Sequence, residues 1–163
     1  MTSQSLLEGK KVLLADDEPD VLETLTDLLS MCSLSTASDF ETAETLLNTE
    51  PFDIAILDIM GINGYQLLDI AKEKGVTAVM LTAHAFSVED TVKSFKKGAA
   101  YYIPKENISE IVSYLEEVLE AKQKGKNSFV SWLVRLGPLY NSRFGEDWQE
   151  EDKDFWERFK YYV

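Results

Sequence analysis

Residues 11–20 read KVLLADDEPD, and this stretch sets the pattern that the rest of the chain repeats. A short apolar run, typical of a buried strand, ends abruptly in four acidic residues: Asp16, Asp17, Glu18 and Asp20. Pro19 suits the first turn of a helix that starts directly after the strand. Because like charges this close repel one another, the acids are either a solvated turn or the ligands of a cation.

The same strand-then-helix pattern recurs along the chain at intervals of about twenty residues. We expect strands over 11–16, 34–37, 53–58, 77–82 and 100–104. Amphipathic runs predict helices over 19–31, 39–49, 65–75, 88–98 and 108–125. Continuous apolar runs such as IAIL suit strands that are buried on both faces. The sequence therefore predicts a doubly wound α/β fold with a five-stranded parallel sheet between helices.

The pattern changes after residue 122, so we predict one domain over 1–122 and a helical extension over 123–163. The extension begins with the polar stretch KQKGKNS. Its first apolar stripe has helical spacing and comprises Phe129, Trp132, Leu133 and Leu136, and we expect Gly137-Pro138 to end that helix. A second amphipathic segment over 146–162 contains Trp148, Phe155, Trp156 and Phe159.

So many large rings need to be buried, and three arrangements stay open. The extension packs on its own domain, forms a homodimer, or docks on another protein.

Charge and composition exclude several classes of function. The net charge is −13, with 22 acids and 8 bases in residues 1–121 and nearly balanced charge beyond them. No segment forms a basic face, so we expect no direct DNA binding. No signal peptide or apolar run of membrane-spanning length is present, and the single cysteine, Cys32, cannot form an internal disulfide. A cytoplasmic location without membrane attachment fits best.

The ends of the predicted strands assemble a chemical site. Asp16-Asp17 ends the first strand, Asp58 the third and Thr82 the fourth, while Lys105 follows the fifth. In a doubly wound sheet these ends share one rim, where like charges about 4 Å apart repel by about 4 kcal/mol at an effective dielectric near 20. A hard divalent cation such as Mg²⁺ removes that cost.

One of these carboxylates has further chemistry available. An aspartate beside Mg²⁺ can attack a phosphoryl group and form an acyl phosphate. Thr82 is placed to hydrogen-bond a phosphoryl oxygen, and Lys105 is placed to neutralise another.

Over about residues 10–122, the sequence resembles a response-regulator receiver domain. The residues that carry the resemblance are LLADDEPDVLETL, DIAILDIM…G, VMLTAHA and GAAYYIPK. The resemblance implies a flavodoxin-like sheet of order 2-1-3-4-5. It also implies that Mg²⁺, for which Mn²⁺ can substitute, is held by Asp16, Asp17, Asp58 and the main-chain carbonyl of Met60. Asp58 is then the phosphoacceptor, supported by Thr82 and Lys105, and Tyr102 matches the aromatic that swings inward when the domain switches.

The resemblance also implies partners. A sensor histidine kinase or a phosphotransfer protein would supply the phosphoryl group, and a downstream protein would read the result. The chain would then be no enzyme beyond catalysing its own phosphorylation and dephosphorylation. We also expect a homodimer as one arrangement, either through the extension or through the face of the fourth helix, fifth strand and fifth helix.

Three departures from the family pattern bear on the site. The loop from Asp58 to Gly64 is short, and we expect Gly61 to take the place of the residues that would otherwise shape the turn. Glu106 follows Lys105 where the family has proline, so we expect a trans bond there. His84, two residues after Thr82, occupies a position that in this family modulates the lifetime of the phosphate.

Two other functions stay as alternatives. A phosphate-independent adaptor or dimerisation module would result if the short loop disabled the metal site. A phosphatase that acts on small molecules would need two aspartates one residue apart after the first strand, whereas this sequence has Asp16-Asp17-Glu18 and no cap domain.

Overall fold

The computed structural model describes residues 5–83 and 86–160, apart from the side chains of Glu151, Phe159 and Lys160. Its centre is a parallel sheet with the strand order β2-β1-β3-β4-β5, as predicted. The strands are β1 (Lys11–Ala15), β2 (Ser33–Ala37), β3 (Ile54–Asp58), β4 (Thr77–Thr82) and β5 (Tyr101–Pro104). Every residue of β3 is buried, because this central strand is covered on both faces.

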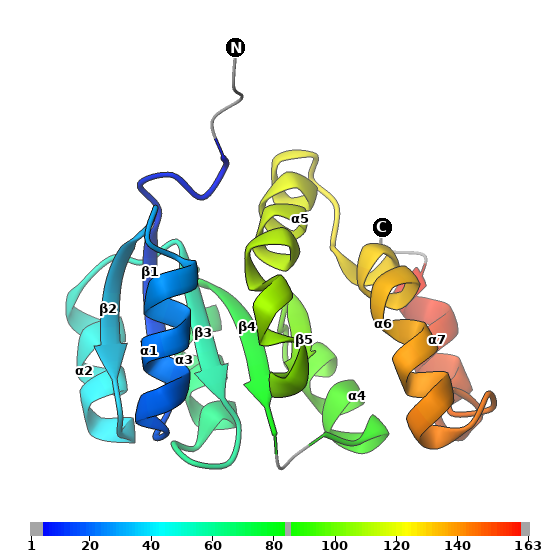
Figure 1. Ribbon diagram of the computed structural model, residues 1–163. Helices are drawn as coiled ribbons and strands as arrows, with labels where there is room; N and C mark the ends of the chain where they lie inside the picture. The colour runs from blue at the N-terminus through cyan, green and yellow to red at the C-terminus, as the bar shows by residue number, and fades with distance from the viewer. Residues whose placement is uncertain (1–4, 84–85, 161–163) are drawn as a thin grey trace.

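Helices cover both faces of the sheet. They are α1 (Pro19–Leu28), α2 (Phe40–Thr49), α3 (Gly64–Glu73), α4 (Val88–Lys96) and α5 (Ile111–Gln123), the last preceded by a short 3₁₀ helix, η1 (Lys105–Glu110). In Figure 1, α1 and α5 lie in front of the sheet and the other three lie behind it. This is the doubly wound arrangement that the sequence predicts, and it gathers the carboxyl ends of all five strands on one edge.

The extension folds into α6 (Phe129–Phe144), a 3₁₀ turn η2 (Glu150–Asp152) and α7 (Lys153–Lys160). The prediction that Gly137-Pro138 would end the first helix is wrong, because α6 runs through both residues. Proline has no N–H, so the carbonyl of Val134, one turn earlier, has no helical donor. The side chains of Pro138 and Val134 both face solvent, so water can bind that carbonyl. The buried stripe meanwhile continues to Tyr140 on the opposite face.

The aromatic rings of the extension pack on the α/β domain of the same chain. Figure 1 shows α6 and α7 beside α4 and β5, away from β1 and β2. Trp132 lies edge-to-face against Phe95 of α4, with ring centroids 5.0 Å apart, and Tyr140 packs in the same way on Phe86 at 5.2 Å. Five large side chains of the extension are almost fully buried: Phe129, Trp132, Tyr140, Trp148 and Trp156. The rings therefore join the hydrophobic core of the chain.

The edge of the sheet is covered by side chains of α6 and its cap. Ser128 Oγ donates to the carbonyl of Ala100 at 2.6 Å, and Trp132 Nε1 donates to the carbonyl of Tyr102 at 2.8 Å. The two donors are one helical turn apart, and the two acceptors are two residues apart: Ala100 directly precedes β5 and Tyr102 lies within it. An exposed edge strand invites pairing with another chain, and here a helix blocks it.

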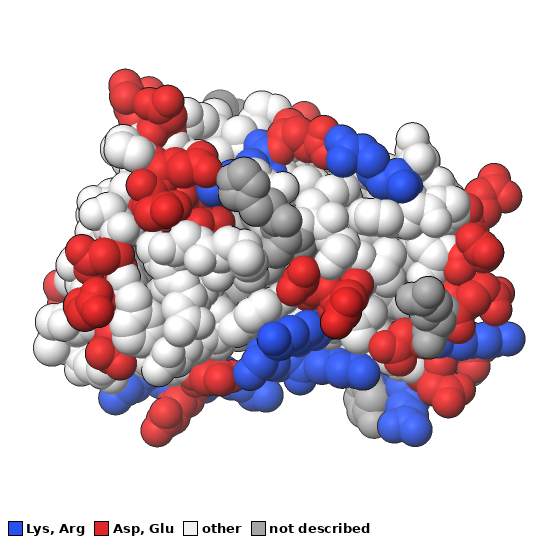
Figure 2. All heavy atoms as spheres, turned by 90° about the horizontal axis from the view of Figure 1, so that it is seen from below, with Lys and Arg blue, Asp and Glu red and all other residues white. Residues whose placement is uncertain are grey.

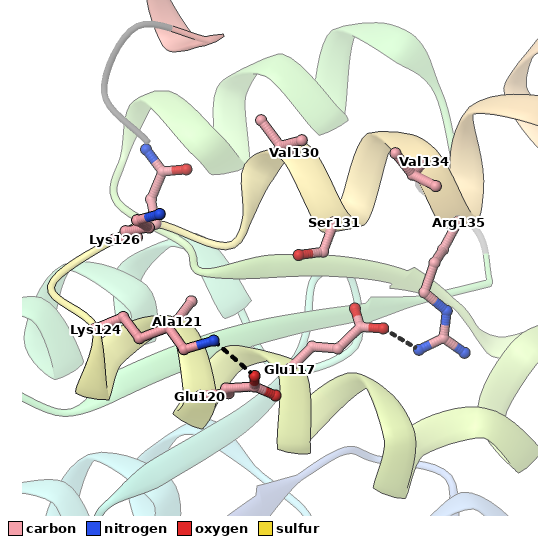
Figure 3. Close-up of a pocket in the computed structure, with 10 residues that line it drawn as sticks. Glu117, Glu120, Ala121, Lys124, Lys126, Val130, Ser131, Val134 and Arg135 are labelled. Atoms are coloured by element: carbon pink, nitrogen blue, oxygen red, sulfur yellow. Dashed lines mark hydrogen bonds and ion pairs between the residues drawn. The ribbon is translucent and has the colours of Figure 1, made fainter.

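A second contact joins α6 to α5 (Figure 3). Arg135 Nη1 donates to Glu117 Oε1 at 2.7 Å, and its guanidinium lies 4.3 Å from the centre of the Tyr114 ring. A cavity of about 540 Å³ opens between the helices, with Val130 and Val134 of α6 along it. No helix within the described ranges is long and apolar enough to cross a membrane.

Candidate functional site

The acidic residues after β1 form a compact cluster. Asp16 is almost fully buried, Glu18 is half-buried at the amino end of α1, and Asp17 is exposed. One carboxylate oxygen from each lies within 4.8 Å of those of the other two. Asp16 Oδ1 also accepts the backbone N–H of Glu18 at 2.9 Å, which fixes its orientation. Glu18 occupies the N-cap position of α1 without a side-chain capping bond, and its carboxylate belongs to the cluster.

Lys105 brings the ends of three strands together. Its ammonium lies 2.9 Å from Asp16 Oδ2, 3.4 Å from Asp58 Oδ1 and 3.5 Å from Glu18 Oε1. Asp58 ends β3 and is buried, so its carboxylate and that of Asp16 lie side by side away from most of the solvent. No cis peptide bond occurs in the described residues, so the bond from Lys105 to Glu106 is trans, as expected.

The pKa values in this group are displaced by burial and by neighbouring charge. Burial raises the pKa of Asp58, and the charge of Asp16 raises it further. Burial likewise raises the pKa of Asp16, although its hydrogen bond with Lys105 opposes this. Burial alone would lower the pKa of Lys105, but its bond with Asp16 and the surrounding carboxylates raise it. Burial and the mutual repulsion of the carboxylates both disfavour their charged forms, and a bound cation would offset this cost.

The short loop after β3 closes tightly over the acidic cluster. The backbone N–H of Gly61 donates to Asp58 Oδ2 at 3.1 Å. A Cβ atom at Gly61 would lie only 2.1 Å from Asp17 Oδ1, so any larger residue there requires the Asp17 carboxylate to move away. The loop ends with Asn63 in the left-handed region and with a bond from Gly64 N–H to the Ile59 carbonyl at 2.9 Å.

These residues fit a magnesium ion. All of the candidate donors are hard oxygen atoms, and Mg²⁺ binds through one or two carboxylates together with water. The close approach of Gly61 shows that the short loop still borders the cluster rather than leaving it open. The side chain of Met60 is exposed, so its carbonyl is the only group of this residue suited to the site.

Thr82 ends β4 and is buried beside a cavity of about 340 Å³. Lys105 lines the same cavity, and so do Glu106 and Arg143. The last two are site residues that the sequence did not reveal. Arg143 lies 38 positions from Lys105 in the chain, and no local pattern indicates that α6 reaches this point.

Tyr102 is fully buried on β5, with its ring directed inward. Burial raises its pKa above the usual range, while hydrogen bonds with the Thr91 side chain and the Ser87 backbone act in the opposite direction. Thr91 Oγ1 is also hydrogen-bonded to the hydroxyl of Tyr140 in α6. Thr91 therefore links Tyr102 to the extension. His84, the candidate modulator, lies outside the described residues.

The rim of the sheet thus combines buried carboxylates, a lysine and a threonine on a doubly wound fold, and comparisons identify the family. The model of the response regulator receiver domain matches residues 12–116, so the chain belongs to this family. It is the receiver domain of a two-component response regulator, and such domains interact with histidine kinases or phosphotransfer proteins.

Relatives and solved structures agree with this assignment. The chain is 36% identical over 138 residues to a probable transcriptional regulator of Guillardia theta, covering 80% of this chain and 53% of the relative. It is 30% identical to the heme response regulator HssR of Staphylococcus saprophyticus, covering 73% of this chain and 55% of HssR. The chain therefore spans about half the length of these relatives.

A CheY-like receiver domain from Methanospirillum hungatei superposes with a TM-score of 0.64 at 26% identity, covering 71% of this chain and 98% of that one.

Proposed function

We propose that this receiver accepts a phosphoryl group on Asp58, with Mg²⁺ bound, from the phosphohistidine of a sensor kinase or a phosphotransfer protein. The observation that supports this best is the ammonium of Lys105 between Asp16 and Asp58, at 2.9 and 3.4 Å. The buried Thr82 lies on the same cavity as Lys105. This set of groups supplies a nucleophile, a cation and a hydrogen-bond donor at one place.

In the proposed step, a carboxylate oxygen of Asp58 attacks the phosphorus atom of the donor. The new O–P bond forms as the bond from phosphorus to the imidazole nitrogen breaks, and the imidazole leaves with the bonding electrons and takes up a proton. Lys105 then shifts toward a phosphoryl oxygen, and the Thr82 hydroxyl donates to another. Bound Mg²⁺, held by Asp16, Asp17, Asp58 and the Met60 carbonyl, would supply the positive charge that allows an anion to approach these carboxylates.

The signal would leave through protein–protein contacts rather than through DNA. Thr91 connects the buried Tyr102 and the β4–α4 region to α6. A shift of Thr82 toward the phosphate would therefore displace the extension as well. The named relatives include probable transcriptional regulators, but the chain matches only about half of their length. We assign no catalysis to it beyond turnover of its own acyl phosphate.

The test is incubation with Mg²⁺ and acetyl phosphate, followed by intact-mass measurement beside an Asp58→Asn variant. We expect one added phosphoryl group on the unmodified chain, and none on the variant or after chelation of Mg²⁺. Asparagine keeps the size of the side chain and its bond with Gly61 N–H, so the variant should stay folded. A folded chain that gains no mass would favour the phosphate-independent adaptor instead.

A further inference from the structure

The extension contributes a cation to the cavity beside the phosphoacceptor. Arg143, near the end of α6, lines the cavity of about 340 Å³ that is also bordered by Thr82 and Lys105. It reaches this point because α6 continues past Pro138. A helix that ended at Gly137-Pro138 would leave the cavity without it.

Arg143 is held at the cavity by two contacts. Its Nη2 donates to both carboxylate oxygens of Glu106, at 2.6 and 2.7 Å, and its guanidinium lies 5.5 Å from the centre of the Phe86 ring. A guanidinium has five N–H donors on three nitrogens, and the ion pair with Glu106 uses only one nitrogen. The side chain is 46% exposed, so it is accessible from the cavity and from solvent.

The charge around the cavity explains what such a cation could do. Seen from the side of the strand ends, acidic side chains gather on one part of this face (Figure 2). Lys105 is already engaged by Asp16, Asp58 and Glu18. Bound Mg²⁺ would offset part of this negative charge, and a further cation at the mouth of the cavity lowers the remaining repulsion of a doubly charged phosphoryl group. Arginine is well suited to this because its planar fork matches phosphoryl oxygens.

We propose that Arg143 is a phosphodonor-binding residue, supplied to the receiver by its own extension. Its guanidinium would contact the phosphoryl oxygens of the incoming donor at the mouth of the cavity, in exchange for part of its contact with Glu106. This inference rests on the proposed phosphorylation of Asp58 and deepens it. It also gives the extension a second role besides covering the β5 edge.

The test measures the second-order rate of Asp58 phosphorylation by acetyl phosphate at saturating Mg²⁺, using intact mass. Arg143→Gln should lower this rate about three- to tenfold. This range lies between the usual contribution of an exposed ion pair and that of a hydrogen bond to a charged group. Arg143→Lys should recover part of the lost rate, because it keeps the charge but not the planar fork. Added salt should narrow the difference between the original chain and Arg143→Gln.

The matched control is Arg135→Gln. Arg135 lies two turns earlier on the same helix and is also paired with a glutamate, but it lines the α5–α6 cavity instead. This variant should react at the original rate. Mg²⁺ affinity and unfolding midpoints should be unchanged in Arg143→Gln, which separates donor binding from a structural effect.

The possible failures are distinguishable. If the original chain gains no phosphoryl group, the proposed function itself fails. If the original chain reacts and Arg143→Gln reacts equally fast, or loses no more than Arg135→Gln, then Arg143 does not bind the donor. A loss in Arg143→Gln that Arg143→Lys shares in full would also overturn the proposal.

Discussion

At the scale of single residues, Gly61 is the point where the short loop packs against the acidic cluster. Its backbone N–H is bonded to Asp58, and a methyl group on its Cα would fit only if the Asp17 carboxylate moved. This close packing fits the prediction that Gly61, a residue without a side chain, compensates for the short loop. The sequence pattern suggests this role, and the close contact gives the physical reason for it.

Gly61→Ala should weaken Mg²⁺ binding about tenfold. This is the smaller end of the loss in metal affinity that follows when a residue that orients a metal ligand is changed. The added Cβ would push Asp17 or the loop out of position. Isothermal titration with Mg²⁺ measures this. Met60→Ala is the control, because its side chain is exposed and only its carbonyl is assigned to the site. Equal affinity in Gly61→Ala and the original chain would contradict the assignment of Asp17 as a ligand.

Much of the candidate site could be predicted, because its residues follow strand ends that a parallel sheet must place together. Asp16, Asp58 and Lys105 are brought within contact distance in this way. Arg143 and Glu106 could not be predicted as a pair, since their contact depends on how far α6 continues and how it lies on the domain. Positions set by tertiary packing leave no periodic signal in the sequence.

At the scale of elements, α6 illustrates a competition between local preference and packing. Proline inside a helix removes a hydrogen bond and clashes with the preceding turn, at a cost of about 3 kcal/mol relative to alanine. Burial of Trp132, Leu136 and Tyr140 on one face outweighs this, and the proline lies on the opposite, exposed face. The buried stripe that crosses Gly137-Pro138 was the stronger signal.

Pro138→Ala should therefore stabilise the chain, by about 1–2 kcal/mol. The restored N–H can bond to the Val134 carbonyl, while the loss of proline rigidity in the unfolded chain offsets part of the gain. Urea unfolding monitored by circular dichroism gives the difference. A lower stability would mean that the packing of α6 needs the distortion that proline imposes.

Trp132→Phe tests the cover of the β5 edge. It removes the donor to the Tyr102 carbonyl and should cost about 1–3 kcal/mol, because a buried acceptor loses its partner donor. Trp148→Phe makes the same chemical change, but its indole donates to the exposed Asn141 side chain, which water can satisfy. The loss of unfolding free energy should be clearly smaller in Trp148→Phe. Equal losses in the two variants would contradict the role of Trp132 at the β5 edge.

At the scale of the whole molecule, the extension and the receiver share one hydrophobic core. The fold of residues 11–123 follows from repeated apolar runs and was predictable in type and order. The arrangement of the extension was not, because amphipathic helices with buried rings fit a partner, a second copy or the same chain equally well. Here the rings lie against α4 and β5 of the same chain.

A variant that ends at Asn127 should lose at least about 3 kcal/mol of unfolding free energy, the cost of losing one buried tryptophan. It should also self-associate, because the β5 edge and Phe95 become exposed. Sedimentation velocity and urea unfolding beside the original chain measure both effects. A monomeric and equally stable variant would show that the extension is dispensable to the receiver.

The hydrogen bonds that Ser128 and Trp132 make at the β5 edge also bear on the order in which parts of the chain fold. Their acceptors lie at the edge of the assembled sheet, so we expect α6 to dock after β5 has paired with β4. On a ribosome the receiver emerges first, and its last strand stays bare until about thirty further residues have been synthesised, a delay of seconds at ordinary elongation rates. We expect mispairing of the exposed β5 edge to be most frequent in that interval, which is when a chaperone would protect the nascent chain.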